Sequence, residues 1–122
     1  MIKRFDRLDV ASSNPAETSA TYKRNFGFKV KSGEGSEEAT IAIGDAEIRI
    51  CGGPAVADVI ASTGEGLAAI WLEAAHLDEV ARSLTRAGLS FSSARIENGR
   101  RVLAVDPAAA NMVRLFIFDR RV

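Results

Sequence analysis

Three arginines lie at positions where a charged side chain is unusual. Each is inside a short segment with the alternation or the apolar content of a β-strand; they are Arg7, Arg49 and Arg114. A charge in such a place costs free energy unless it is paired or solvated. A guanidinium group can bind a carboxylate or a phosphate through two parallel hydrogen bonds. These arginines therefore indicate either a site for the anionic group of a small ligand or a set of internal ion pairs.

Acidic side chains in the same kind of segment provide the second interpretation. Successive side chains in a strand point to opposite faces, so Asp9 shares a face with Arg7, and Glu47 shares a face with Arg49. Glu73 has a similar place in a later strand-like segment. Opposite charges on neighbouring strands attract each other, so these acids could pair with the arginines. The anion site and the ladder of internal salt bridges both remain open on this reasoning.

Aromatic residues accompany two of the strand-like segments. Trp71 shares its strand face with Ala69, and Phe116 shares its face with Arg114. The two rings could form an apolar wall for a planar ligand, with room beside Ala69. They could equally fill the interior of the protein.

Other catalytic chemistry has little support in the sequence. The single histidine, His76, precedes a predicted helix and is more typical of a surface or capping residue. No Ser-His-Asp set, phosphate-binding glycine loop or zinc-ligand spacing is present. Cys51 is the single cysteine, so the chain has no internal disulfide framework, and we expect a buried, unreactive thiol.

Composition and charge restrict the class of protein. The chain has 122 residues, with 16 basic and 16 acidic side chains, which predicts one neutral globular domain. Nucleic-acid binders normally carry a basic excess, so no nucleic-acid partner is expected. A neutral surface associates readily, which fits a homodimer. No apolar signal or membrane-spanning run is visible, which predicts a cytoplasmic location and no membrane partner.

The elements that would position these residues form an internal repeat. Each half shows a strand, a helix and three strands, with the first helix capped by Asn14 and both helices followed by a glycine, Gly27 or Gly88. The predicted strands are 5–11, 28–32, 40–43 and 46–51, then 67–73, 89–96, 102–105 and 112–118; the helices begin at Pro15 and Leu77.

We therefore predict an α+β fold made of two βαβββ modules within one domain, 1–122. Module 1 spans about 3–51, a glycine-rich linker spans 52–66, and module 2 spans about 67–119. Alternation predicts that one set of apolar residues faces the helices and is buried: Leu8, Val10, Ile48, Ile50, Ile70, Leu72, Val113 and Leu115.

This order of elements and its motifs resemble the vicinal oxygen chelate superfamily of glyoxalases, bleomycin-resistance proteins and extradiol dioxygenases. The resemblance covers nearly the whole chain and rests on FDRLDVASSNP and TYKRNFGF in the first half. In the second half it rests on GLAAIWLEAAHLDEVARSLTRAGLSF and VLAVDPAAANMVRLFIF. It implies that the two modules form curved mixed sheets around a shared cavity, and that the protein is a homodimer.

The resemblance also implies where a metal ion would be held. The four family positions fall on Arg7, Arg49, Ala69 and Arg114, and a shift of two residues would put Asp9 in place of Arg7. A guanidinium group and a methyl group offer no lone pair to a divalent cation. We therefore expect no metal and no cofactor.

The predicted function is metal-free binding of a small organic ligand, anionic or aromatic, as in drug-sequestering members of the superfamily. No catalytic residue is assigned. The expected ligand-binding residues are Arg7, Asp9, Arg49, Trp71, Arg114 and Phe116. Two alternatives remain: a metal-dependent lyase, isomerase or dioxygenase, and a structural or interaction protein with a filled cavity.

Overall fold

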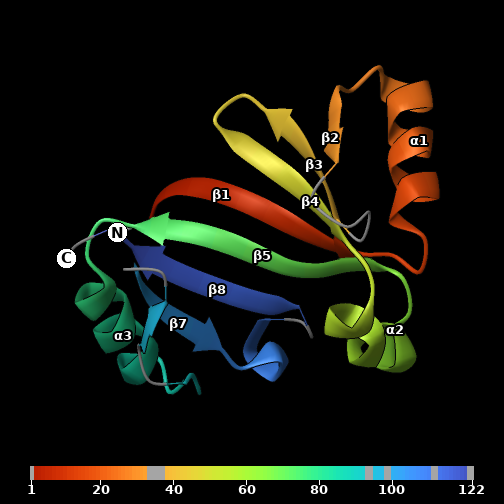
Figure 1. Ribbon diagram of the computed structural model, residues 1–122. Helices are drawn as coiled ribbons and strands as arrows, with labels where there is room; N and C mark the ends of the chain where they lie inside the picture. The colour runs from red at the N-terminus through yellow and green to blue at the C-terminus, as the bar shows by residue number, and fades with distance from the viewer. Residues whose placement is uncertain (1, 33–37, 93–94, 98–99, 111–112, 121–122) are drawn as a thin grey trace. The chain divides into compact units, whose positions relative to one another are not determined.

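The computed structural model describes residues 2–32, 38–92, 95–97, 100–110 and 113–120. The first half runs β1 (Ile2–Ala11), α1 (Pro15–Phe26), β2 (Val30–Ser32), β3 (Glu38–Ile43) and β4 (Ala46–Cys51), followed by η2 (Pro54–Val56) and α2 (Ala57–Thr63). The second half runs β5 (Gly66–Ala74), α3 (Leu77–Arg86), β6 (Arg95–Glu97), β7 (Arg100–Val105), η3 (Pro107–Ala110) and β8 (Arg114–Asp119) (Figure 1). The predicted α+β class and the repeated βαβββ order are confirmed.

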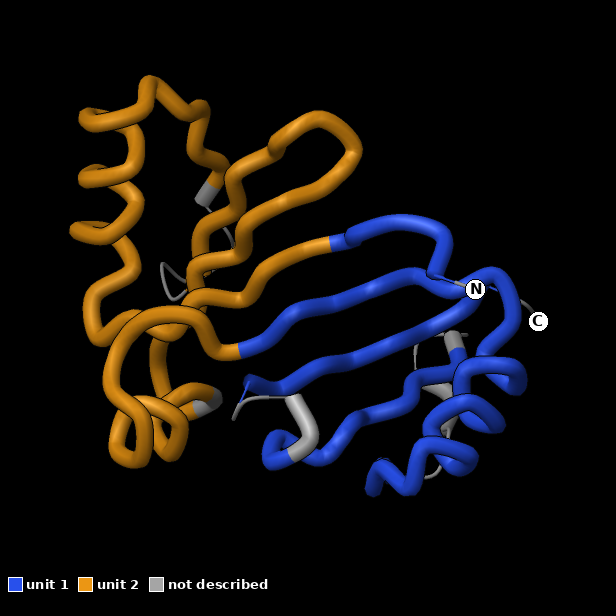
Figure 2. Tube along the Cα trace, turned by 180° about the vertical axis from the view of Figure 1, so that it is seen from behind, with its two compact units in different colours: residues 1–6, 69–122 blue, residues 7–68 orange. Residues whose placement is uncertain are grey.

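The chain divides into two compact units (Figure 2). Unit 1 contains residues 1–6 and 69–122, and unit 2 contains residues 7–68. The first residues of β1 thus belong with the second half of the chain. Within the described ranges, no helix is long and apolar enough to cross a membrane.

The sequence signals at the ends of α1 have their expected roles. The side chain of Asn14 accepts a hydrogen bond from the backbone N–H of Glu17 at 3.2 Å, and Pro15 occupies the first helical position. Gly27 ends the helix with a φ of 70°, a left-handed conformation that costs glycine little.

In unit 2 the strands follow the order β2-β3-β4-β1. The pairs β2–β3 and β3–β4 are antiparallel, and β4–β1 is parallel. Buried Ala39, Ile41 and Ile50 form the core of this unit, against which Val10, Tyr22, Phe28, Val30 and Ile48 pack. Since Tyr22 belongs to α1, the face of the sheet with this core is covered by that helix.

In unit 1 the strands follow the order β5-β8-β7-β6. The pair β5–β8 is parallel, whereas β8–β7 and β7–β6 are antiparallel. Its core joins Leu77 and Val80 of α3 to the strands, with Leu103, Val105 and Ile117 buried against them. The side chains of Leu115 and Ile117 therefore face α3, and Phe116 and Phe118 lie on the opposite face of β8.

The residues predicted to face the helices are less buried than expected. Ile50 is fully buried, and the other seven are partly buried rather than exposed. Four of those seven pack against the core clusters: Val10, Ile48, Leu72 and Leu115.

The predicted strand at 89–96 is only partly correct. The regular strand β6 covers Arg95–Glu97, and Phe91 forms an isolated bridge to Val105. The backbone of Ser92 donates to the carbonyl of Ala104, and that of Asp106 donates to the carbonyl of Ser90. These bonds pair the backbone of Ser90 and Ser92 with that of Asp106 and Ala104, although neither serine lies in a regular strand. The Asn98-Gly99 pair, whose sequence is typical of a hairpin turn, lies outside the described residues.

Candidate functional site

The two strand arginines of unit 2, Arg7 and Arg49, lie on the sheet face opposite the α1 core. Strand register places Arg7 beside Glu47 and Asp9 beside Arg49, on the neighbouring parallel strands β1 and β4. The Nε of Arg7 donates a hydrogen bond to Oδ1 of Asp9 at 2.9 Å. Arg7 is therefore held by a carboxylate two residues away on its own strand.

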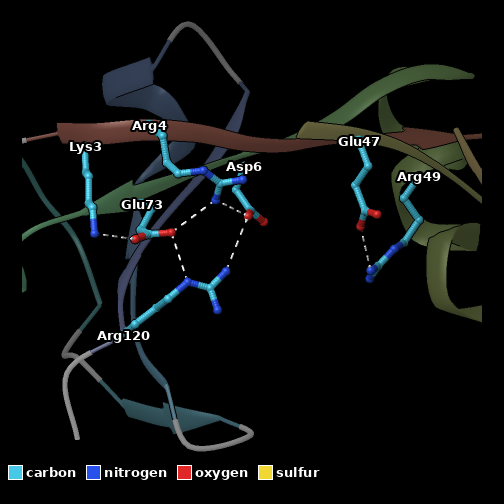
Figure 3. Close-up of polar contacts among 7 residues, drawn as sticks. All are labelled: Lys3, Arg4, Asp6, Glu47, Arg49, Glu73 and Arg120. Atoms are coloured by element: carbon cyan, nitrogen blue, oxygen red, sulfur yellow. Dashed lines mark hydrogen bonds and ion pairs between the residues drawn. The ribbon is translucent and has the colours of Figure 1, made fainter. Parts of the chain in front are cut away.

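Arg49 lies between two carboxylates. Its Nη2 donates to Oε1 of Glu47 at 3.0 Å (Figure 3), and its Nε is 3.1 Å from Oε1 of Glu38 on β3. The second contact is an ion pair without hydrogen-bond alignment, because the buried Nε finds no hydrogen-bond partner among the described residues. Arg7 and Arg49 are thus engaged in internal ion pairs, as the salt-bridge interpretation expects.

The corresponding face of unit 1 is aromatic. Register pairs Ala69 with Arg114 and Trp71 with Phe116 on the parallel strands β5 and β8. The rings of Trp71 and Phe116 stack with centroids 4.5 Å apart and an interplanar angle of 21°. Phe118 is buried, with its ring centroid 6.3 Å from that of Trp71. The predicted residues Trp71, Phe116 and Arg114 therefore share one strand face.

Arg114 differs from the other two arginines in its surroundings. It is exposed at the first position of β8, whereas Arg7 and Arg49 are partly buried. Its guanidinium group has no hydrogen bond or ion pair in the part of the chain that the structure describes. Binding of an external anion would therefore displace no partner among the described residues.

A charged network occupies the far end of the same face (Figure 3). Glu73 is 3% exposed and accepts hydrogen bonds from Nε of Arg120 at 3.0 Å and Nη1 of Arg4 at 3.1 Å. Lys3 Nζ is 3.6 Å from its other oxygen, and Arg4 also donates to Asp6 at 2.8 Å. The Arg120 guanidinium carbon lies 5.6 Å from the centre of the Phe118 ring.

This network keeps the buried carboxylate ionised. Burial alone would raise the pKa of Glu73, because it penalises the charged form. The hydrogen bonds from Arg120 and Arg4, with the charges of Arg120 and Lys3, outweigh burial and lower that pKa below its ordinary value. Glu73 is thus a fully compensated anion rather than a free base.

Metal-ligand geometry is not found within the described ranges. No group of three or more His, Cys, Asp and Glu side chains there is arranged to hold a metal ion. His76 occupies the N-cap position of α3, but its side chain makes no capping hydrogen bond.

The chain resembles solved structures over almost its full length. No family model matches it, and no curated protein does. Methylmalonyl-CoA epimerase from Mycobacterium tuberculosis has a TM-score of 0.73 and 17% identity, with 99% of this chain and 90% of that chain covered. A Streptomyces coelicolor methylmalonyl-CoA epimerase variant in complex with 2-nitronate-propionyl-CoA has a TM-score of 0.73 and 20% identity, covering 98% and 95%. A hypothetical protein from Bacillus halodurans C-125 has a TM-score of 0.75 and 17% identity, covering 98% and 95%.

The epimerases belong to the vicinal oxygen chelate superfamily. The chain has the vicinal oxygen chelate fold. At these identities the likeness shows the fold alone, and the chemistry has to be argued from this chain's own residues.

Several charged residues of the site were not predicted. Lys3 and Arg4 precede the strand predicted at 5–11, Asp6 lies near its start, and Arg120 follows the strand predicted at 112–118. The available signal was Glu73, an acid within the apolar strand β5, since a buried carboxylate requires cationic partners.

Cys51 is expected to be a slow nucleophile. Burial, together with the nearby negative charges of Asp9 and Glu38, raises the pKa of its thiol to about 11. The thiolate is the reactive form, so very little is present at neutral pH. Alkylation by iodoacetamide at pH 7.5 should be slower than that of glutathione, and should approach the glutathione rate only after denaturation in urea. Equal rates for folded protein and glutathione would contradict this assignment.

Proposed function

We propose that the chain binds a small organic ligand, anionic or aromatic, without a metal ion. The observation that carries the proposal is the exposed Arg114 guanidinium, without an internal partner in the described structure, beside the stacked Trp71 and Phe116 rings. A guanidinium donor and an aromatic surface bind opposite ends of an organic acid, the first by charge and the second by apolar contact. Arg7, Asp9 and Arg49 remain in the proposal as a second polar surface.

The residue types at the family's metal positions support binding without a metal. By the resemblance these positions fall on Arg7, Arg49, Ala69 and Arg114. Guanidinium nitrogens have no lone pair to offer, and two of these groups are already bound to carboxylates. This set of residues does not fit a divalent cation.

An enzyme is the second candidate, and the structural neighbours favour it. One of them is a methylmalonyl-CoA epimerase in complex with methylmalonyl-CoA and NH4+. A methylmalonyl group carries a carboxylate, so an anionic ligand is common to both candidates. A metal-dependent lyase, isomerase or dioxygenase of the same superfamily would need ligands other than the four residues at those positions.

The two candidates predict different results for the purified protein. Elemental analysis should find no stoichiometric zinc, iron or manganese. A thermal-shift screen should show stabilisation by organic acids, since a ligand that binds only the folded state raises the unfolding temperature. Stoichiometric metal together with epimerase or lyase turnover would favour the enzyme. A chain that responds to no small molecule would favour a structural or interaction protein.

We also propose that the chain forms a homodimer, because a neutral net charge opposes association least. Most soluble oligomers are symmetric, and the two-fold dimer is the commonest form. Light scattering after size-exclusion chromatography at micromolar concentration should give twice the 13.0 kDa mass of the chain. A mass of one chain under these conditions would contradict the proposal.

A further inference from the structure

We infer that the ligand is an aromatic monocarboxylate, with its carboxylate on Arg114 and its ring against Trp71 and Phe116. This inference rests on the proposed function and narrows it to one ligand class and one strand face of unit 1.

The cationic side chains of unit 1 that lie near this face differ in whether they already have a carboxylate partner. Arg120 and Arg4 both donate to Glu73, and Arg4 also donates to Asp6. A ligand anion that approached Arg120 or Arg4 would compete with the carboxylates of Glu73 and Asp6. Arg114 has no such competitor among the described residues, so the anionic group of a ligand is best accommodated at the Arg114 end of the face.

The spacing of the strands fits a carboxylate attached directly to a ring. Neighbouring strands lie about 4.8 Å apart, and a strand rises about 3.3 Å per residue. Trp71 and Phe116 are each two residues further along than Ala69 and Arg114, so the aromatic stack begins about 6.6 Å along the strands from Arg114. A carboxylate on the guanidinium therefore places its own ring over the stack, without a long spacer.

Small side chains flank the aromatic stack and Arg114. Ala69 pairs with Arg114 on one side, and Ala104 of β7 pairs with Phe116 on the other. Neither has atoms beyond Cβ that would project over the rings. Ala69 is itself 4% exposed, so the accessible part of this face consists of the exposed Arg114 and the partly buried Trp71 and Phe116 side chains.

Among the described residues of this face, Arg114 is the one guanidinium without a carboxylate partner, and this also selects the charge of the ligand. One arginine matches a carboxylate with two parallel hydrogen bonds. A phosphate dianion is best held by more than one cation, and the other nearby arginines are neutralised by Glu73 and Asp6. The structure thus favours a monocarboxylate over a phosphate ester.

The test uses 2-naphthoate as the probe and calorimetry or fluorescence as the measurement on the full chain. Arg114→Gln should weaken 2-naphthoate binding roughly ten-fold or more, the loss typical of a charged hydrogen bond. Arg114→Lys, which keeps the charge but not the fork, should weaken it less. Arg82→Gln is the matched control, because Arg82 is also an exposed arginine of unit 1 and lies on α3. It should leave binding unchanged.

Two analogues separate the charge from the ring. 2-Naphthamide, which lacks the charge, should bind wild-type protein about as weakly as 2-naphthoate binds the Arg114→Gln variant. Cyclohexanecarboxylate keeps the charge and should lose the contribution of stacking. Equal binding of the acid and the amide, or equal losses in the Arg114 and Arg82 variants, would overturn the inference. If 2-naphthoate fails to bind while other organic acids stabilise the chain, the inference fails and the proposed function stands.

Discussion

Replacing Glu73 by alanine is expected to lower the free energy of unfolding by about 2–4 kcal/mol. The Glu73 side chain is 4% exposed and balances Arg4, whose side chain is 25% exposed. Its removal leaves that cation poorly solvated and takes away the common partner of three positive groups. The expected loss is smaller than for a fully buried pair, because Lys3 and Arg120 are 62% and 58% exposed and regain water.

A matched control is available in unit 2. Glu47 also pairs with an arginine, but Glu47 and Arg49 are 34% and 31% exposed. Glu47→Ala should therefore cost about 1 kcal/mol or less. Urea unfolding of both variants measures the difference. If Glu73→Ala proves no more destabilising than Glu47→Ala, the network around Glu73 does not stabilise the fold.

The Glu73 network also has a pH signature. The folded-state pKa of Glu73 is held below its unfolded value, so its stabilisation is present above about pH 4.3 and is lost as the pH falls through the folded pKa. Glu73→Gln removes this titration. The free energy of unfolding of that variant should fall less steeply below about pH 4.3 than that of the wild type. Parallel curves in this acid range would show that the ionisation of Glu73 is not linked to folding.

Local signals in the sequence were sufficient for most of the fold. The Asn14 cap and the left-handed Gly27 define α1 through atoms within a few residues of each other. Leu77 and Val80, three residues apart in sequence, lie on the buried face of α3, and alternation placed Arg114 with Phe116 on β8. Such periodicities depend only on backbone geometry, so they can be recognised in the sequence without knowledge of the tertiary structure.

The ion-pair partner of each charged group could not be predicted in the same way. Arg7, Arg49 and Arg114 look alike in sequence, yet the first two meet carboxylates and the third meets none among the described residues. The difference for Arg49 comes partly from Glu38, which lies in β3 two residues before the expected start of that strand at Thr40. Ion pairing depends on residues brought together by strand register, which local patterns leave undetermined.

The capping of the N-terminus of α3 also depends on a residue that is distant in the sequence. His76 makes no capping hydrogen bond with its side chain. Instead, Oδ2 of Asp119 at the end of β8 accepts from the backbone N–H of Leu77 at 2.9 Å. Asp119 is 0% exposed, and its Oδ2 lies 3.8 Å from Nη1 of Arg101. A strand carboxylate thus satisfies one helix N–H and complements the positive end of the helix dipole.

Asp119→Ala is therefore expected to lower the free energy of unfolding by about 2–3 kcal/mol, because it leaves a buried N–H of α3 without an acceptor. Amide hydrogen exchange at Leu77 should accelerate together with the loss of stability. Asp119→Asn should cost less than the alanine variant, since its amide oxygen can still accept from Leu77.

Arg101→Gln separates the helix cap from the ion pair. The Arg101 side chain is 30% exposed, so loss of its charge should cost about 1 kcal/mol or less and leave exchange at Leu77 unchanged. If the Arg101 variant matches Asp119→Ala in both measurements, the ion pair, and not the hydrogen bond to Leu77, stabilises this end of α3. If Asp119→Asn is as damaging as alanine, the buried charge matters more than the acceptor. The three variants together therefore determine whether β8 holds α3 through a backbone hydrogen bond or through charge.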